Sequence, residues 1–253
     1  MQYWPNRMLT NLQYRVLTRI FPRHSDSSRG EAYERNSKLD VLLGSDFINK
    51  IVGKTVIDFG CGEGNDAIEM AQKGARRVIG IDIREDLLQR ARNKAIEAGA
   101  QNSCIFTTST GEHADIVVSI DAFEHFADPG RILNTMNTLL QPAGEVIVSF
   151  GPTWYHPLGG HTFSVFPWAH LIFSEEALIR WRSTFKTDGA TRFCEVAGGL
   201  NQMTVRRFEK LVEQSPLKVA ALEFVPIKRL KPFHNRLTRE YMTATVRCQL
   251  IKR

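Results

Sequence analysis

Between residues 54 and 150 the chain alternates short apolar segments with longer segments of helical period. The apolar segments span 54–59, 77–81, 104–107, 114–120 and 145–150. Helices are expected between them at 65–74, 84–98 and 128–140. Strands that alternate with helices in this way predict a mainly parallel sheet with helices on both faces.

The alternation stops after residue 150 and resumes near residue 204. A helix is expected at 204–214, followed by strands at 218–225 and 241–251. Because no crossover helix separates these two strands, they predict an antiparallel finish to the sheet. The intervening segment, 151–200, is rich in aromatic residues and histidine, with one helical stretch at 174–184.

Helical periodicity also covers 4–21 and 31–52, ahead of the sheet, with a break expected at Gly44. The predicted organisation is therefore an N-terminal helical lid at 1–52 and a main domain at 53–253. Segment 151–200 forms an insertion in that main domain.

The charge distribution argues against a nucleic-acid partner, although the formal net charge is +6. The first 30 residues carry +4 and the last 28 carry +7, which leaves −5 for the body of the chain, 31–225. A nucleic-acid-binding domain is expected to carry its basic surface on the folded body. The composition, 43% hydrophobic and 24% charged, is typical of a globular protein, and no apolar run reaches the roughly 18–20 residues of a membrane-spanning helix.

Four cysteines are scattered along the chain, at Cys61, Cys104, Cys194 and Cys248. They form no CxxC pair and accompany no histidine pair at zinc spacing, so reduced thiols and no bound metal are expected. Residues 1–24 lack the continuous apolar core of a secretory signal. We therefore expect a cytoplasmic protein; peripheral membrane contact and mitochondrial targeting by the Arg-rich N-terminus stay open as alternatives.

A glycine-rich turn, Asp58-Phe-Gly-Cys-Gly-Glu-Gly64, follows the first strand expected in the sheet. Glycines at the carboxyl end of a strand let a ligand approach the backbone, in the crevice where open α/β sheets bind ligands. A dinucleotide fingerprint would need glycine in place of Asn65, and no Gly-Lys-Ser/Thr follows for a P-loop. A nucleoside with a non-phosphate tail is then the better ligand, and Asp82, after the second strand, is placed to bind two ribose hydroxyls.

Four segments together resemble the class I S-adenosylmethionine-dependent methyltransferases. They are 58–64, Gly80-Ile-Asp82, the segment 114–125 that ends in Phe-Glu-His, and Leu-Leu-Gln-Pro-Ala-Gly at 139–144. The last two look like segments of the small-molecule branch, which includes quinone-pathway methyltransferases. The resemblance implies an α/β fold with a Rossmann-like, seven-stranded, mostly parallel sheet, an antiparallel last strand, an N-terminal helical lid and an insertion after strand 5.

The resemblance also implies a binding site for S-adenosylmethionine. Gly60, Cys61 and Gly62 would hold the methionine portion of this cofactor through their backbone. Asp58 would support that loop, and Asp82 would bind the ribose.

Further cofactor contacts are implied beyond the glycine loop. Ile83 would pack on the adenine, and Ser109 or its neighbour Thr108 would read the adenine amine. Asp121 and Ala122, after the fourth strand, would line the floor beneath the transferable methyl.

The N-terminal region is expected to close over this site. Tyr33 matches the place where relatives often cover the cofactor. The basic helix at 4–21 is interpreted first as a docked lid and second as a contact with an anionic membrane surface, with a transit segment as a further alternative.

Methyl transfer from a sulfonium is an in-line displacement in which the protein mainly aligns and desolvates the reactants. A general base is needed only where the acceptor must lose a proton. His156 and His161 are the candidates because imidazole titrates near neutrality, although both could instead form the packed wall of a cap. Glu124 and His125 are interpreted as loop anchors.

The predicted function is transfer of a methyl group from S-adenosylmethionine to oxygen or carbon of a small molecule. The aromatic residues of 152–173 favour an apolar, aromatic or lipid-linked acceptor. One alternative is an RNA or protein methyltransferase, against which the acidic body of the chain argues. The other is a non-catalytic cofactor-binding module with a regulatory role.

Overall fold

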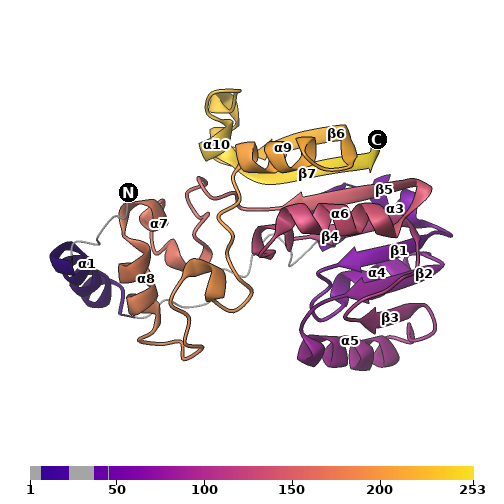
Figure 1. Ribbon diagram of the computed structural model, residues 1–253, viewed down its shortest axis with the longest axis horizontal. Helices are drawn as coiled ribbons and strands as arrows, with labels where there is room; N and C mark the ends of the chain where they lie inside the picture. The colour runs from indigo at the N-terminus through magenta and orange to yellow at the C-terminus, as the bar shows by residue number, and fades with distance from the viewer. Residues whose placement is uncertain (1–6, 23–36, 45) are drawn as a thin grey trace.

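A seven-stranded sheet organises the computed structural model, which describes residues 7–22, 37–44 and 46–253 (Figure 1). The strand order is β3-β2-β1-β4-β5-β7-β6. The strands are β1 (Thr55–Phe59), β2 (Arg77–Ile81), β3 (Cys104–Thr107), β4 (Ala114–Ile120), β5 (Leu140–Phe150), β6 (Leu217–Pro226) and β7 (Thr243–Lys252). β1 to β5 pair in parallel, and β7 runs antiparallel to both β5 and β6. The predicted mostly parallel sheet with an antiparallel last strand is confirmed.

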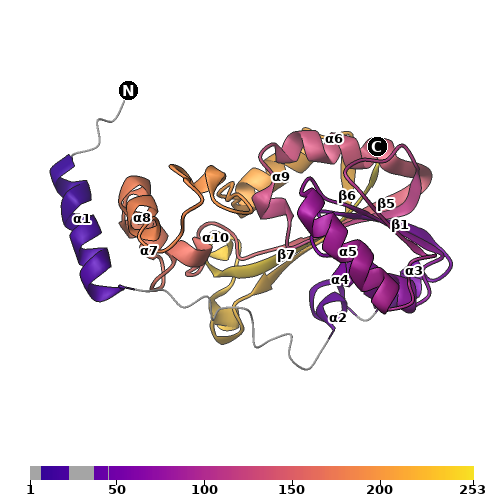
Figure 2. The same cartoon turned by 90° about the horizontal axis from the view of Figure 1, so that it is seen from below.

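Helices cover both faces of the sheet, as predicted (Figure 2). One face carries α2 (Lys38–Leu43), α3 (Asp46–Ile51), α4 (Asn65–Gln72) and α5 (Glu85–Glu97), and the other carries α6 (Pro129–Leu139) and α9 (Val205–Glu213). The first core lies between the sheet and α2 to α5, and it contains Val56 of β1. The second core lies between the sheet and the helices α6 and α9, and it contains Ile57. The two residues separate because successive strand side chains point to opposite faces.

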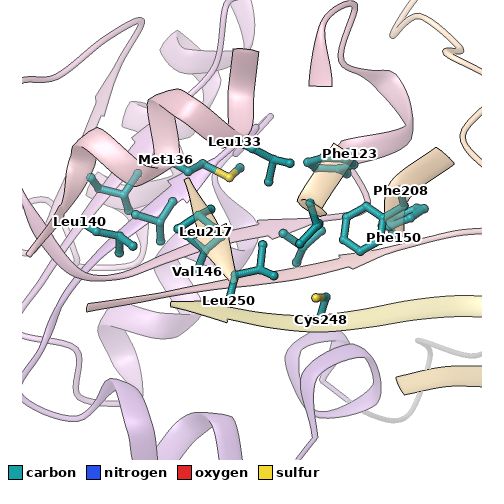
Figure 3. Packing of buried hydrophobic residues seen from close by; sticks show 14 of the residues in the cluster. Phe123, Leu133, Met136, Leu140, Val146, Phe150, Phe208, Leu217, Cys248 and Leu250 are labelled. Carbon is teal, nitrogen blue, oxygen red and sulfur yellow. The ribbon is translucent and has the colours of Figure 1, made fainter. Parts of the chain in front are cut away.

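Three buried phenylalanines close one end of the second core (Figure 3). The ring centroids of Phe123, Phe150 and Phe208 lie 5.0 to 5.6 Å apart. They come from the turn after β4, from β5 and from α9. This contact fixes the short helix η2 (Phe123–His125) on the sheet, and η2 also carries two polar residues of the candidate site.

Two predicted strand boundaries are wrong. β5 begins at Leu140 rather than at residue 145, because Leu140 pairs with Ala114 ahead of an irregularity in the β4–β5 register. β7 begins at Thr243 rather than at residue 241, because Arg239–Met242 forms the short helix α10, which follows η5 (Lys228–Phe233). The break expected at Gly44 is confirmed: this residue has φ +88° and separates α2 from α3.

The insertion between β5 and α9 folds around a core of its own. It contains η3 (His161–Phe163), α7 (Ala169–Ile172), α8 (Glu175–Arg182) and η4 (Phe193–Glu195). Phe163, Trp181 and Phe193 are buried in this third core, together with Leu17 of α1 (Arg7–Ile20). The aromatic residues that mark the insertion in the sequence therefore stabilise it.

α1 packs against α8 on the side away from the sheet (Figures 1 and 2). The side-chain oxygen of Gln13 accepts hydrogen bonds from the backbone N and the hydroxyl of Ser174, at 3.0 and 2.7 Å. The indole of Trp181 donates to the carbonyl of Phe21 at 2.7 Å. The lid role of this helix stays a prediction. Among the described residues no helix is long and apolar enough to cross a bilayer.

Candidate active site

The glycine loop leaves the carboxyl end of β1 and turns sharply against β2. The backbone N–H groups of Gly60 and Cys61 both donate to the carbonyl of Ile81, at 2.8 and 3.0 Å. Gly60 has φ +88°, and a Cβ there would lie 2.6 Å from the Cβ of Ala122. Gly62 also has a positive φ, but a Cβ there would meet open space. The loop therefore needs glycine at both positions and leaves the Gly62 backbone accessible.

Asp82 connects this loop to the start of α5. One carboxylate oxygen accepts a hydrogen bond from the backbone N of Gly62 and the other from the backbone N of Arg84, both at 2.9 Å. The Nε of Arg84 also lies 3.5 Å from Oδ1, so the spare acceptor site of this buried side chain is on Oδ2. Ile83 follows with 90% of its surface exposed, which leaves its side chain free to pack on a flat ring.

Asp58 lies beneath the loop with 2% of its surface exposed. Its Oδ2 has no hydrogen-bond partner within the described part of the chain. Burial and the neighbouring carboxylate of Asp66 raise the pKa of Asp58 to about 8, although Lys38 opposes the shift. The support of the loop by Asp58 stays a prediction, because none of the hydrogen bonds among the described residues joins this carboxyl group to the loop.

Lys38 is a residue that the sequence analysis missed. Its Nζ lies 3.2 Å from Asp66 of α4 and 3.3 Å from Asp121, directly after β4. Burial lowers the pKa of Lys38, but the two carboxylates outweigh burial and raise it overall. Burial raises the pKa of Asp121, and Lys38 counteracts that effect. No local pattern distinguishes Lys38 from any other helical lysine in the sequence.

The remaining predicted cofactor residues fall into four groups. Asp121, with φ +48°, and Ala122 adjoin the glycine loop, as expected for a shared floor. Cys61 is half-buried over Gly80, where a Cβ would lie 2.9 Å from its sulfur. Ser109 and Thr108 are exposed directly after β3, and their contact with the adenine stays a prediction. Tyr33 lies outside the described residues.

η2 joins this floor to the insertion. Glu124 is 2% exposed, and its Oε1 accepts a hydrogen bond from the backbone N of Gly151 at 3.3 Å. The Nδ1 of His125 lies 2.7 Å from the carbonyl oxygen of Gly199. Both contacts fit the predicted loop-anchoring role. Burial, assisted by Asp121, raises the pKa of Glu124 to about 8.

The two histidines proposed as bases lie in different environments. The Nδ1 of His156 accepts a hydrogen bond from the backbone N of Leu158 at 2.9 Å, inside a turn of the insertion. His161 reaches toward η2, where its ring centroid lies 5.3 Å from that of His125. Burial lowers the pKa of both His156 and His161 to about 4. Neither imidazole titrates near neutrality, so that premise is wrong, and a catalytic role for either stays a prediction.

A pocket of about 420 Å³ opens beside η2. Its volume lies within the roughly 300–1,000 Å³ typical of small-molecule sites. Its walls come from η2, the insertion and α9: His125, Ala127, Glu175, Arg192, Cys194, Leu200, Asn201, Gln202 and Arg207. His125 is the residue of η2 that lines this pocket, and it follows the predicted floor residues Asp121 and Ala122 by a few positions in the chain.

Comparison with known proteins identifies the family of this chain. Residues 16–221 match a family model described as a methyltransferase domain. The chain belongs to this methyltransferase family. The strand order, the glycine loop and the acidic residue after β2 agree with the expected class I, Rossmann-like fold. Part of the chain is also similar to enzymes named for ubiquinone biosynthesis, as the resemblance in the sequence implies.

The methyltransferase is similar to curated proteins over less than half of their length. It is 35% identical over 105 residues to the ubiquinone biosynthesis O-methyltransferase of Stutzerimonas stutzeri. That match covers 39% of this chain and 45% of the relative. It is 34% identical over 100 residues to the ribosomal protein L11 methyltransferase of Photobacterium profundum. That match covers 39% of this chain and 34% of the relative.

Solved structures share the methyltransferase fold at low identity. The magnesium protoporphyrin IX methyltransferase of Synechocystis PCC 6803, solved with bound SAH, is 18% identical with a TM-score of 0.56. That alignment covers 98% of this chain and 97% of the other. The geranyl diphosphate C-methyltransferase of Streptomyces coelicolor A3(2) is 13% identical with a TM-score of 0.54, over 82% of this chain and 77% of the other.

The residues of the methyltransferase crevice fit S-adenosylmethionine, the cofactor that its family implies. Gly62 offers accessible backbone where a side chain would stand in open space. Asp82 is held rigidly with acceptor capacity to spare, and Ile83 presents an exposed apolar surface. These features suit a methionine tail, a ribose and an adenine, in that order along the crevice.

Proposed function

We propose that this methyltransferase transfers the methyl group of S-adenosylmethionine to an oxygen or carbon atom of a small apolar, aromatic or lipid-linked acceptor. The observation that carries the proposal is the position of Ala122. Its Cβ stands against the glycine loop, and the next residues, η2, border the pocket of the insertion. One short segment thus lines both the cofactor crevice and the acceptor side.

The bound cofactor supplies an electrophilic methyl group on a sulfonium and its own leaving group. The protein's residues align the two reactants. Gly60 and Gly62 shape the loop, Asp82 fixes the ribose end, and Asp121 with Ala122 forms the floor. The insertion covers the acceptor side and excludes water, which strengthens electrostatic interactions in the site.

The acceptor class is supported by the curated relatives rather than by the lining of the pocket. Phe163 and Phe193 are buried in the insertion's own core. The pocket beside η2 is lined largely by polar side chains, among them Glu175, Arg192 and Arg207. Relatives named for a ubiquinone precursor pathway and for a ribosomal protein match this chain over similar lengths. Because these matches span only about 100 residues, they favour the shared fold more strongly than any one acceptor.

The experiment is to incubate the protein and methyl-labelled S-adenosylmethionine with fractionated cell extract. We expect label in the small-molecule, organic-soluble fraction and an equal amount of SAH. Label in RNA or protein would replace the proposal with macromolecule methylation. Cofactor binding without SAH formation from any fraction would indicate the non-catalytic module.

We also propose that α1 holds the protein on an anionic membrane surface, where lipid-linked acceptors reside. Met8, Leu9, Leu12 and Ile20 remain exposed although they are apolar, while the opposite side of the helix packs on α8. The same helix carries three exposed arginines and no acidic residue: Arg7, Arg15 and Arg19. An exposed apolar strip flanked by arginine is the pattern of a helix that lies in a lipid interface.

Co-sedimentation with phosphatidylglycerol vesicles tests this contact. The wild-type protein is expected to bind these vesicles and not neutral phosphatidylcholine vesicles. Leu12→Gln should weaken binding, whereas Leu237→Gln, a change at a 90% exposed leucine far along the chain, should leave it unchanged. Equal binding by both variants, or none by the wild type, would end the membrane proposal.

A further inference from the structure

A cluster of metal-binding side chain types lies where η2 meets the insertion. Glu124 and His125 come from η2, and His161 begins η3. One ligand atom of each residue lies within 4.8 Å of the other two. We propose that Glu124, His125 and His161 bind one divalent transition-metal ion. The cluster is separate from the residues assigned to the cofactor, so the proposal does not depend on methyl transfer.

Two atoms of the cluster lack partners that a buried polar atom normally has. The Oε2 of Glu124 and the Nε2 of His161 are both shielded from solvent, and neither has a hydrogen-bond partner among the described residues. Buried polar atoms without partners are rare and cost free energy in a folded protein. Two such atoms on facing residues indicate that a further ligand belongs between them, and an ion satisfies both at once.

His125 is oriented as metal-binding histidines are. Its Nδ1 lies 2.7 Å from the carbonyl oxygen of Gly199. A carbonyl only accepts hydrogen bonds, so Nδ1 carries the proton and Nε2 keeps a free lone pair. A backbone carbonyl that holds the second nitrogen is the usual support of a metal-bound imidazole. The N–H of Gly151 supports Glu124 in the same way, through Oε1.

The ligand set selects the class of ion. Two imidazoles and one carboxylate suit Zn²⁺, Co²⁺, Mn²⁺ or Fe²⁺, whereas Mg²⁺ and Ca²⁺ prefer oxygen ligands alone. Ligands about 2.1 Å from zinc lie roughly 3–4 Å from one another, so these side chains need to close by only about 1 Å. Three protein ligands leave open positions on the ion.

The coordination positions that the three side chains leave unfilled could bind the acceptor. His125 also lines the pocket of about 420 Å³ beside η2. An ion held here would present its open positions to that pocket, where a phenol or other hydroxyl could bind as a ligand. A metal ion lowers the pKa of an oxygen ligand, which would remove the need for a histidine base with an acceptor of this kind.

Cobalt binding to the full chain, followed by visible absorption, tests the site. We expect one equivalent of Co²⁺ to give the d–d bands of a four- or five-coordinate ion, and Zn²⁺ to displace it. Glu124→Gln keeps the acceptor oxygen for Gly151 and should weaken Co²⁺ binding at least tenfold. His161→Asn should do the same, because asparagine tolerates the φ of +51° at this position. His113→Ala, at an exposed histidine ahead of β4, is the matched control and should bind Co²⁺ like the wild type.

A measurement on the wild-type protein covers the case in which a variant fails to fold. In ¹⁵N spectra of labelled imidazoles, Zn²⁺ should shift the Nε2 resonances of His125 and His161, while Nδ1 of His125 remains protonated. Shifts at His113 or His234 instead, or no tight binding of Co²⁺ or Zn²⁺, would overturn the proposal. Cofactor affinity, measured in the same samples by calorimetry, separates this outcome from a failure of the proposed methyl transfer.

Discussion

The Nζ of Lys38 lies 3.3 Å from the Oδ2 of Asp121, and this ion pair ties α2 to the floor of the cofactor crevice. The same ammonium reaches Asp66 at the start of α4. One cation thus holds two acidic residues that would otherwise repel each other and the nearby Asp58. Lys38 therefore neutralises the acidic side chains at the floor of the crevice.

Replacing Lys38 with methionine should weaken cofactor binding. The substitution leaves two partly buried carboxylates without their cation, and the floor residue Asp121 loses its fixed position. We expect the dissociation constant for S-adenosylmethionine to rise about tenfold, equivalent to ~1.4 kcal/mol. Calorimetric titration measures it. Lys50→Met is the control: it removes an ion pair between Lys50 of α3 and Glu145 of β5, and it should change the constant less than twofold. Equal effects of the two changes would remove the special role of Lys38.

Gly60→Ala should damage both folding and cofactor binding. The new Cβ would stand 2.6 Å from Ala122, at a φ of +88° that alanine tolerates poorly. We expect a loss of about 1–3 kcal/mol in the free energy of unfolding and no measurable binding of S-adenosylmethionine. Urea denaturation and calorimetry give the two quantities. At Gly111, where a Cβ meets nothing within 4 Å and φ is ordinary, alanine should be tolerated.

Asp58 should make the cofactor-free protein less stable as pH rises. Burial raises its pKa from 3.8 to about 8, so the folded state holds a proton that the unfolded state has released above pH ~4. The folded state then binds more protons between these values, and the free energy of unfolding falls as pH increases toward 8. Asp58→Asn should reduce this slope between pH 6.5 and 8 in urea denaturation series, and the slope that remains belongs to Glu124, whose pKa burial also raises to about 8. Asp86→Asn, at an exposed aspartate, should leave the slope unchanged. A slope that Asp58→Asn leaves intact would assign the titration to another group.

Phe123→Ala should destabilise the whole domain. The side chain is fully buried and contacts the rings of Phe150 and Phe208. Truncation of a buried phenylalanine typically costs about 3–5 kcal/mol, and here it also frees η2 from the sheet. Thermal and urea unfolding measure the loss. Phe233→Ala, at an exposed phenylalanine, should fall within about 0.5 kcal/mol of the wild type, and a similar small loss at Phe123 would contradict this packing.

The fold could be predicted because its determinants are local. Hydrophobic period, the Asp128-Pro129 helix start and the glycine turn each act within a few residues, and all agree with one topology. The cofactor crevice was predictable for the same reason, since Asp82 and the loop follow directly from strand ends. The errors lie at β5, which pairing with a distant strand extends, and at β7, which begins later because α10 takes the residues ahead of it.

The rest of the site depends on contacts between distant segments. Lys38 acquires its role only because α2 folds beside β4, and no spacing rule connects it to Asp121. His161 meets Glu124 only after the insertion has closed against η2. The low pKa of His161 has the same origin, because burial is set by the tertiary structure and not by the neighbouring residues in sequence.

Consecutive residues of η2 serve different parts of the molecule: Phe123 belongs to the core beside the sheet, and Glu124 faces the insertion. The side chain of Glu124 is held by the backbone N–H of Gly151, a contact that does not depend on the side chains of 152–200. In evolution, and in engineering, that segment can be exchanged for another while the cofactor half stays unchanged. New acceptors become accessible by grafting, with Gly151 and Gly199 as the two junctions whose backbone contacts must be kept.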